Sequence, residues 1–129
     1  MKLDFEVRDY ECDVQGIVNN AVYLNYLEHA RHKFLLARDI DFVELAKEDK
    51  NLVLREANYV YHKSLFPDDK FTVDTKAQIE GKLKMVFLQE IYRGDELVLN
   101  AKVTGACVSF KDGKIFKIED IVDPKILEG

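Results

Sequence analysis

The chain has 129 residues and a net charge of −5, with 47% hydrophobic and 33% charged residues. This length fits one domain over residues 1–129 with its own hydrophobic core, and the composition is that of a globular protein rather than a disordered one. The excess of acids argues against nucleic acid as a partner, because phosphate binding needs clustered Lys and Arg.

The cysteines and the N-terminal residues bear on the compartment. Cys12 and Cys107 are too few and too far apart for a disulfide framework, which favours a reducing environment. The first residues include acids where a signal peptide would be apolar, and no apolar run approaches the ~18 residues of a membrane span. We therefore expect a cytoplasmic protein with no membrane partner.

In chain order, the first predicted element is a strand over residues 3–7, where apolar and acidic residues alternate. A polar loop follows over residues 8–19. A long helix is predicted from Asn19 or Asn20, both good N-cap residues, to about Arg38. Its apolar stripe recurs at helical spacing, at Tyr23, Tyr26, Leu27, Ala30 and Phe34. A shorter helix is predicted over 42–47.

From residue 52 onward the apolar period changes to two, which is typical of strands. The turn at Asp112-Gly113 is a strong hairpin signal, because both residues tolerate positive φ. One strand, one long helix and a run of hairpin-linked strands predict an α+β fold, an antiparallel sheet wrapped around a single helix. The later strands are predicted at 52–62, 71–80, 83–92, 97–110 and 115–118.

The segment over residues 10–23 carries the chemistry. Asp13 stands in a loop that passes through Gly16 into the start of the long helix. Free N–H groups at a helix N-terminus, with the helix dipole behind them, stabilise an oxygen that gains negative charge. A nearby carboxylate can attack a carbonyl or activate a water, so the segment combines the two parts that acyl transfer needs. The alternative from spacing alone is that Asp13 is an ordinary loop or cap residue.

This segment, with Tyr26-Leu27-Glu28-His29-Ala30-Arg31 after it, resembles the signature of the 4-hydroxybenzoyl-CoA thioesterase family. That signature is an Asp, two variable residues, a Gly, two apolar residues and a short polar or aromatic pair that opens the helix. The resemblance implies a hotdog fold, with a five- to six-stranded antiparallel sheet. The matching positions are Asp13, Gly16, Ile17, Val18, Asn19, Asn20 and Tyr23.

The resemblance implies a role for each catalytic position. Asp13 would be the nucleophile or the general base, the Asn20 backbone N–H would polarise the thioester carbonyl, and Gly16 would let the chain pass close to the acyl group. Many bacterial acyl-CoA members have His at position 20, and Asn cannot exchange a proton at neutral pH. The backbone N–H is unaffected by this change. Substrate contacts are expected at Ile17, Val18, Tyr23, Tyr59, His62 and Lys63.

Several of these residues have a second interpretation. Core packing explains the tyrosines as well as a pocket does, and lysines at strand ends are commonly solvated. Arg31 is expected to pair with an acid rather than with a ligand. His29 and His32 are expected on a solvated or interface face, so no metal is predicted. Cys12, with His62 as its base, is rejected as the nucleophile because nothing local lowers its pKa.

The sequence therefore predicts an acyl-CoA or aroyl-CoA thioester hydrolase, with acyl carrier protein as an alternative carrier and no cofactor besides the CoA of the substrate. An exposed edge strand and the resemblance both predict a homo-oligomer, a dimer or a homotetramer, with sites at the subunit interface. Two other hypotheses remain open: a non-catalytic protein that binds acyl-CoA or acyl carrier protein, and a dehydratase. The Asn at position 20 weighs against the dehydratase.

Overall fold

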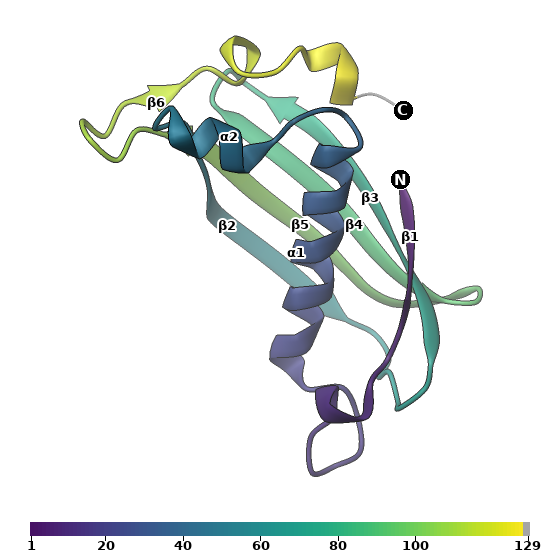
Figure 1. The fold of residues 1–129 in the computed structure, drawn as a ribbon. Helices are drawn as coiled ribbons and strands as arrows, with labels where there is room; N and C mark the ends of the chain where they lie inside the picture. Colours follow the sequence, from purple (N-terminus) through teal and green to yellow (C-terminus); the bar gives the residue numbers. More distant parts are fainter. Residues whose placement is uncertain (128–129) are drawn as a thin grey trace.

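The computed structural model describes residues 1–127, and its strands form one antiparallel sheet with a long helix against one face (Figure 1). Within these residues the elements are β1 (Lys2–Glu6), α1 (Asn20–Leu36), α2 (Phe42–Lys47), β2 (Asn51–Tyr61), β3 (Lys70–Glu80), β4 (Lys84–Arg93), β5 (Glu96–Val108) and β6 (Ile115–Phe116). Short 3₁₀ turns stand at Asp9–Glu11, Ile118–Asp120 and Pro124–Leu127. The predicted α+β class is confirmed.

The sheet has the strand order β1-β3-β4-β5-β2, so β2 and β1 lie at its two edges. Consecutive hairpins join β3 to β4 and β4 to β5, while β6 pairs with the end of β5 through Cys107 and Phe116. β2 is 11 residues long, pairs with β5 along one side and carries a β-bulge between Leu54 and Glu56. Its other side has no strand partner among residues 1–127.

The core lies between α1 and the concave face of the sheet. All five residues of the predicted helix stripe are buried, which confirms the amphipathic pattern. From the sheet they meet side chains that are fully buried, among them Val73, Ile91, Leu99 and Val103. Because successive strand residues face opposite sides, alternate residues of each strand reach this core.

Element boundaries differ from the prediction by one or two residues in most places. Relative to the length of the element, the largest difference is the last strand, which was predicted over 115–118 and ends at Phe116. The Ile118 side chain is fully buried and its N–H donates to the Lys82 carbonyl, so the chain turns into a 3₁₀ helix instead of extending the strand. Across residues 1–127, no helix is both long and apolar enough to cross a membrane.

Candidate active site at the start of the long helix

The loop over residues 12–18 is a closed turn that leads into α1. The Asp13 N–H donates to the Ile17 carbonyl at 2.9 Å, and the Gly16 N–H donates to the Asp13 carbonyl at 3.0 Å. Gly16 has a φ of +79°, a left-handed conformation that glycine adopts without steric cost. A bridge between Cys12 and Val18 holds the two ends of the loop together. The backbone around Asp13 is therefore fixed by its own hydrogen bonds.

The Asp13 carboxylate is half-buried and only partly engaged. Its Oδ1 accepts the Gln15 N–H at 2.8 Å, which fixes the side-chain rotamer. Its Oδ2 has no hydrogen-bond donor within the part of the chain that the structure describes. One oxygen is thus a local anchor, and the other is available to a ligand or a water.

The start of α1 leaves one backbone donor open. The Asn19 side chain caps the helix by accepting the Ala21 N–H at 2.9 Å, and the Asn19 carbonyl accepts the Val22 N–H. The first N–H groups of a helix have no intrahelical partner. Among residues 1–127 no acceptor is found for the Asn20 N–H. This is the donor that the resemblance assigns to the thioester carbonyl.

Core residues hold the loop in place. Val18 is fully buried, and its N–H donates to the carbonyl of the buried Leu65. The Leu65 N–H donates in turn to the Tyr23 hydroxyl at 2.9 Å, and burial raises the pKa of Tyr23. The structure therefore assigns the Val18 and Tyr23 side chains to the core that supports the loop. Sequence reasoning missed Leu65, because its contacts with the loop span more than forty positions.

A second tether joins the 3₁₀ turn before the loop to the helix. The Tyr26 hydroxyl donates to Glu11 Oε1 at 2.8 Å, and the same oxygen accepts the Arg8 N–H. Burial of the ring, together with this bond, raises the pKa of Tyr26. Tyr26 thus stays a neutral donor at any physiological pH, and the loop is held on both sides.

The remaining predicted contacts lie at the end of β2. Tyr59 is half-buried on the helix-facing side of the sheet, opposite Ala101. His62 and Lys63 are exposed just after the strand, and His62 Nε2 lies 2.6 Å from Asn100 Oδ1. The Tyr61 hydroxyl donates to the Asn20 carbonyl at 3.3 Å, which brings this strand end to the helix start. From the sequence, Tyr61 could either pack in the core or line a pocket, and this bond places its hydroxyl beside the start of α1.

Two further expectations concern the groups around the helix. Burial, then the neighbouring Asp13 and Glu11 carboxylates, raise the pKa of the Cys12 thiol, which disfavours the thiolate that a nucleophile needs. The expected ion pair of Arg31 is wrong. Its guanidinium bonds to Gln89, and within residues 1–127 no carboxylate lies at ion-pair distance from it. The described residues also hold no cluster of three His, Cys, Asp or Glu side chains suited to a metal.

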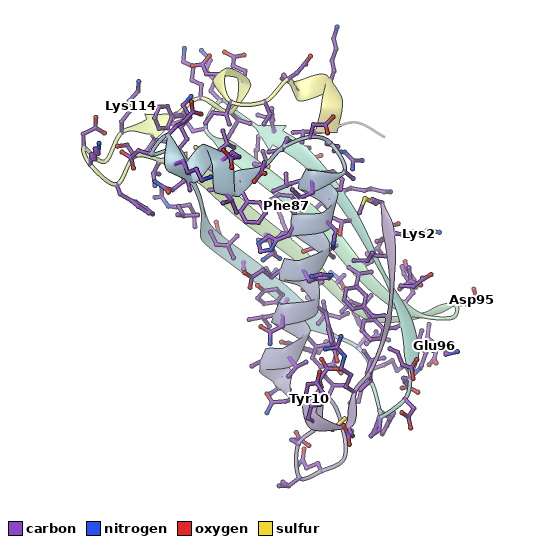
Figure 2. All side chains as sticks on the ribbon, viewed as in Figure 1. Lys2, Tyr10, Phe87, Asp95, Glu96 and Lys114 are labelled. Atoms are coloured by element: carbon purple, nitrogen blue, oxygen red, sulfur yellow. The ribbon has the colours of Figure 1, made fainter. Side chains whose placement is uncertain are left out.

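Two cavities flank α1. A shallow groove of about 960 Å³ runs along β1 and the Asp9–Glu11 turn, and a pocket of about 210 Å³ lies between α1, α2, β2 and the centre of the sheet. Figure 2 shows Phe87, which lines the smaller pocket, beside the C-terminal half of α1 and at the other end of the helix from Tyr10. Neither cavity is lined by a residue of the 12–20 segment.

Known proteins resemble this chain along most of its length. Acyl-acyl carrier protein thioesterase ATL3 of Arabidopsis thaliana, a chloroplastic protein, is 35% identical over 103 residues, which cover 78% of this chain but 54% of ATL3. Long-chain acyl-CoA thioesterase FadM of Escherichia coli is 29% identical over 130 residues, and the match covers 98% of this chain and 96% of FadM. The crystal structure of a hypothetical protein from Aquifex aeolicus superposes with a TM-score of 0.88, at 28% identity and 99% coverage of both chains.

The family comparison agrees with the fold. A family profile described as the thioesterase-like superfamily matches residues 7–126, which include the loop, the long helix and the whole β2–β5 sheet. The predicted hotdog fold is confirmed by this match and by the superposition. The chain belongs to the thioesterase-like superfamily.

Proposed function

We propose that this protein hydrolyses acyl-CoA or aroyl-CoA thioesters, with an acyl carrier protein thioester as the alternative substrate. The observation that carries the proposal is that Asp13 Oδ2 and the Asn20 N–H, on either side of one hydrogen-bonded turn, both lack a partner among residues 1–127. FadM is a long-chain acyl-CoA thioesterase and ATL3 an acyl-acyl carrier protein thioesterase, which supports both carriers. Because this chain spans about half of ATL3, the activity of the whole protein is part of the proposal.

The chemistry needs few groups. The Asn20 N–H stabilises the oxyanion that forms when the thioester carbonyl is attacked, and the helix dipole adds to that stabilisation. Asp13 Oδ2 either attacks the carbonyl carbon, giving an acyl-enzyme anhydride that water then hydrolyses, or takes a proton from an attacking water. In both routes the C–S bond breaks and CoA leaves as a thiolate. Asn20 needs no side-chain proton in either route.

A second copy of the chain would complete the site. β2 is a long edge strand, and two such strands pair antiparallel across a two-fold axis. Its Tyr61 end is bonded to the helix start, while Leu52 at the other end lines the 210 Å³ pocket. Antiparallel pairing therefore sets the Asp13 loop of one protomer beside the pocket of its partner. This supports a dimer, or a tetramer of two such dimers, with shared sites.

The proposal also includes the specific family, the cellular location and the substrate contacts. The segment over residues 13–23 supports membership in the 4-hydroxybenzoyl-CoA thioesterase family, and the composition supports a cytoplasmic location. Tyr59, His62 and Lys63, at the end of β2 nearest the loop, are proposed to contact the substrate. Ile17 is the half-buried member of the apolar pair before the helix and is proposed to meet the acyl group.

The test replaces the carboxylate alone. In Asp13→Asn the amide oxygen can still accept the Gln15 N–H, so the loop should keep its shape. Release of free CoA from a thioester should fall by about 10²- to 10⁴-fold, the range for loss of a general base. The measurement is steady-state kcat/KM with a thiol reagent, on protein whose circular dichroism matches the wild type.

Asp9→Asn is the matched control. Asp9 also accepts a nearby backbone N–H, that of Tyr10 at 2.8 Å, and lies four residues from Asp13. It should keep the wild-type rate. A wild-type rate in Asp13→Asn would refute the mechanism, and thioester binding by calorimetry without thiol release would favour the non-catalytic binding protein instead.

A further inference from the structure

The arginine in the middle of α1 is buried without a counter-charge. Arg31 is 7% exposed, and its Nη1 donates to Gln89 Oε1 at 3.0 Å. Burial lowers the pKa of its guanidinium, although Tyr59 and Glu28 act in the opposite sense. In the described residues no carboxylate pairs with it. A cation in such a position costs free energy unless its donors are used.

Gln89 holds Arg31 in one orientation. The two Gln89 amide donors are both engaged, one with the Leu27 carbonyl and one with the Thr75 hydroxyl, each at 3.0 Å. The Gln89 oxygen must therefore face Arg31. A guanidinium has five N–H donors in a planar fork, and Gln89 occupies one of them. No nitrogen of Arg31 is both sealed from solvent and without a hydrogen-bond partner in the described structure, so the nitrogens beyond Nη1 keep some contact with solvent.

The cavity beside Arg31 is the 210 Å³ pocket between α1 and β2. Arg31 is one of its lining residues, and most of the rest of its wall is apolar: Leu35, Phe42, Leu52, Leu54, Met85 and Phe87. An apolar protein cavity of about 150 Å³ is large enough for benzene. This pocket therefore has the size of one aromatic ring or one short hydrocarbon chain. The Arg31 guanidinium is the buried hydrogen-bond donor in its wall.

Two other titratable groups face the pocket. Glu28 and His32 line it from the same helix, and they pair with each other at 3.7 Å with both side chains partly exposed. His32 also lies against the Phe42 ring at 4.4 Å between ring centroids, and burial lowers its pKa. At neutral pH, Arg31 is thus the buried cation of this pocket.

We propose that Arg31 determines specificity: it donates hydrogen bonds to an acceptor oxygen on the acyl group of the thioester, a keto, hydroxyl or carboxylate oxygen. This rests on the proposed thioesterase function and names the class of acyl group. A purely hydrocarbon acyl group would leave the Arg31 donors unpaired in an apolar pocket, which is unfavourable. A group with an oxygen at the right depth satisfies them, and the apolar wall packs around its carbon atoms.

The position of the pocket sets which protomer supplies the acid. Arg31 lies 11 residues along α1 from Asn20, about 16 Å at ~1.5 Å per residue. Measured along the helix backbone, this separation exceeds the length of a ring-sized acyl group. If two β2 edges pair antiparallel, the loop of the partner subunit comes to the Leu52 side of the pocket instead, which suits a ring-sized acyl group.

The test measures a ratio rather than a rate. Matched CoA esters that differ by an oxygen, hexanoyl against 3-oxohexanoyl and adipyl, and benzoyl against 4-hydroxybenzoyl, are compared by kcat/KM. In the wild type at least one oxygenated ester should be preferred about 10- to 100-fold, the range for a hydrogen bond to a charged group. Arg31→Met should bring that ratio close to one. The pair of esters whose kcat/KM ratio changes in Arg31→Met identifies the kind of oxygen that Arg31 binds.

Two further variants separate this role from a structural one. Gln89→Glu gives Arg31 a carboxylate partner, at the loss of the donor to the Leu27 carbonyl, so in protein whose circular dichroism matches the wild type the preference should fall although the cation remains. Arg38→Met is the control, since Arg38 stacks on the Phe34 ring 3.6 Å away and does not line the pocket. It should keep the wild-type ratio.

Failure of the Arg31 role and failure of the thioesterase function would give different results. Equal kcat/KM for plain and oxygenated esters in the wild type would overturn the role of Arg31 and leave the thioesterase function standing. If no ester is hydrolysed, the proposed function fails, and calorimetric binding of the same esters to wild type and Arg31→Met decides the role of Arg31 by itself. An unchanged ratio in folded Arg31→Met also overturns it.

Discussion

At the level of single residues, Asp49 is a carboxylate whose surroundings bear on stability. It stands at the end of the α2 segment with a φ of +59° and accepts hydrogen bonds from the Ser109 hydroxyl and from the Phe110 and Lys111 N–H groups. These bonds, that of Ser109 first, lower its pKa to about 2. One side chain thus ties the start of β2 to the turn after β5.

Replacing Asp49 with Asn should lower stability in a way that depends on pH. Asn tolerates the positive φ, so the change removes chiefly the charge. Because the folded pKa lies below the unfolded value of about 3.9, the ionised carboxylate stabilises the fold fully above pH 4. That contribution is lost as the pH falls through about 2. Urea midpoints for wild type and variant should therefore differ at pH 7 and converge near pH 2; a constant difference would contradict this.

The predictable part of the candidate site is the part that is local in sequence. Asp13, Gly16 and Asn20 lie within eight positions, and their cap and turn chemistry can be recognised from residue types alone. The Gln89 partner of Arg31 lies 58 positions away, on β4. Helical spacing indicates that Arg31 is near the buried stripe but cannot indicate which strand residue faces it, so the expected ion pair was wrong.

At the level of elements, β2 is an edge strand whose outer side has no partner strand among residues 1–127. It pairs with β5 on one side only, and Leu54 on its helix-facing side is 53% exposed. Inward-pointing charges on an edge strand are a device by which proteins prevent edge pairing. If two copies associate through β2, a lysine at position 54 would lie in the interface between the two β2 strands.

Leu54→Lys should therefore convert the oligomer to monomer while the circular dichroism spectrum stays unchanged. Leu83→Lys is the control, because Leu83 is 41% exposed in the turn between β3 and β4, away from the β2 edge. Sedimentation or light scattering gives the mass of each variant. An unchanged mass for Leu54→Lys would exclude β2 as the interface.

The strands themselves were predictable because period-two alternation persists wherever one face of a sheet is buried. The β3 alternation over Phe71, Val73 and Thr75 is an example, since all three are buried. Strand order was not predictable from the residues, because β2 is separated from β5 by two intervening strands along the chain and pairs with it nonetheless. The edge position of β2, and with it the place for a second copy, emerges only from the three-dimensional arrangement.

At the scale of the whole molecule, Asp13 lies before the N-terminal end of α1 and the pocket lies beside its C-terminal half. Tyr10, just before the Asp13 loop, and Phe87 of the pocket mark these two places (Figure 2). A site built within one protomer and a site shared between two make opposite predictions for mixed dimers. Asp13→Asn removes the acid and leaves the pocket, while Leu52→Trp fills the pocket and leaves the acid.

Mixing these two inactive variants should restore activity if the site is shared. In a mixed dimer, the acid of the Leu52→Trp chain faces the open pocket of the Asp13→Asn chain, so one site of two is intact. Random 1:1 exchange makes half of the dimers mixed, which gives about a quarter of wild-type activity. A site within one protomer would leave every combination inactive.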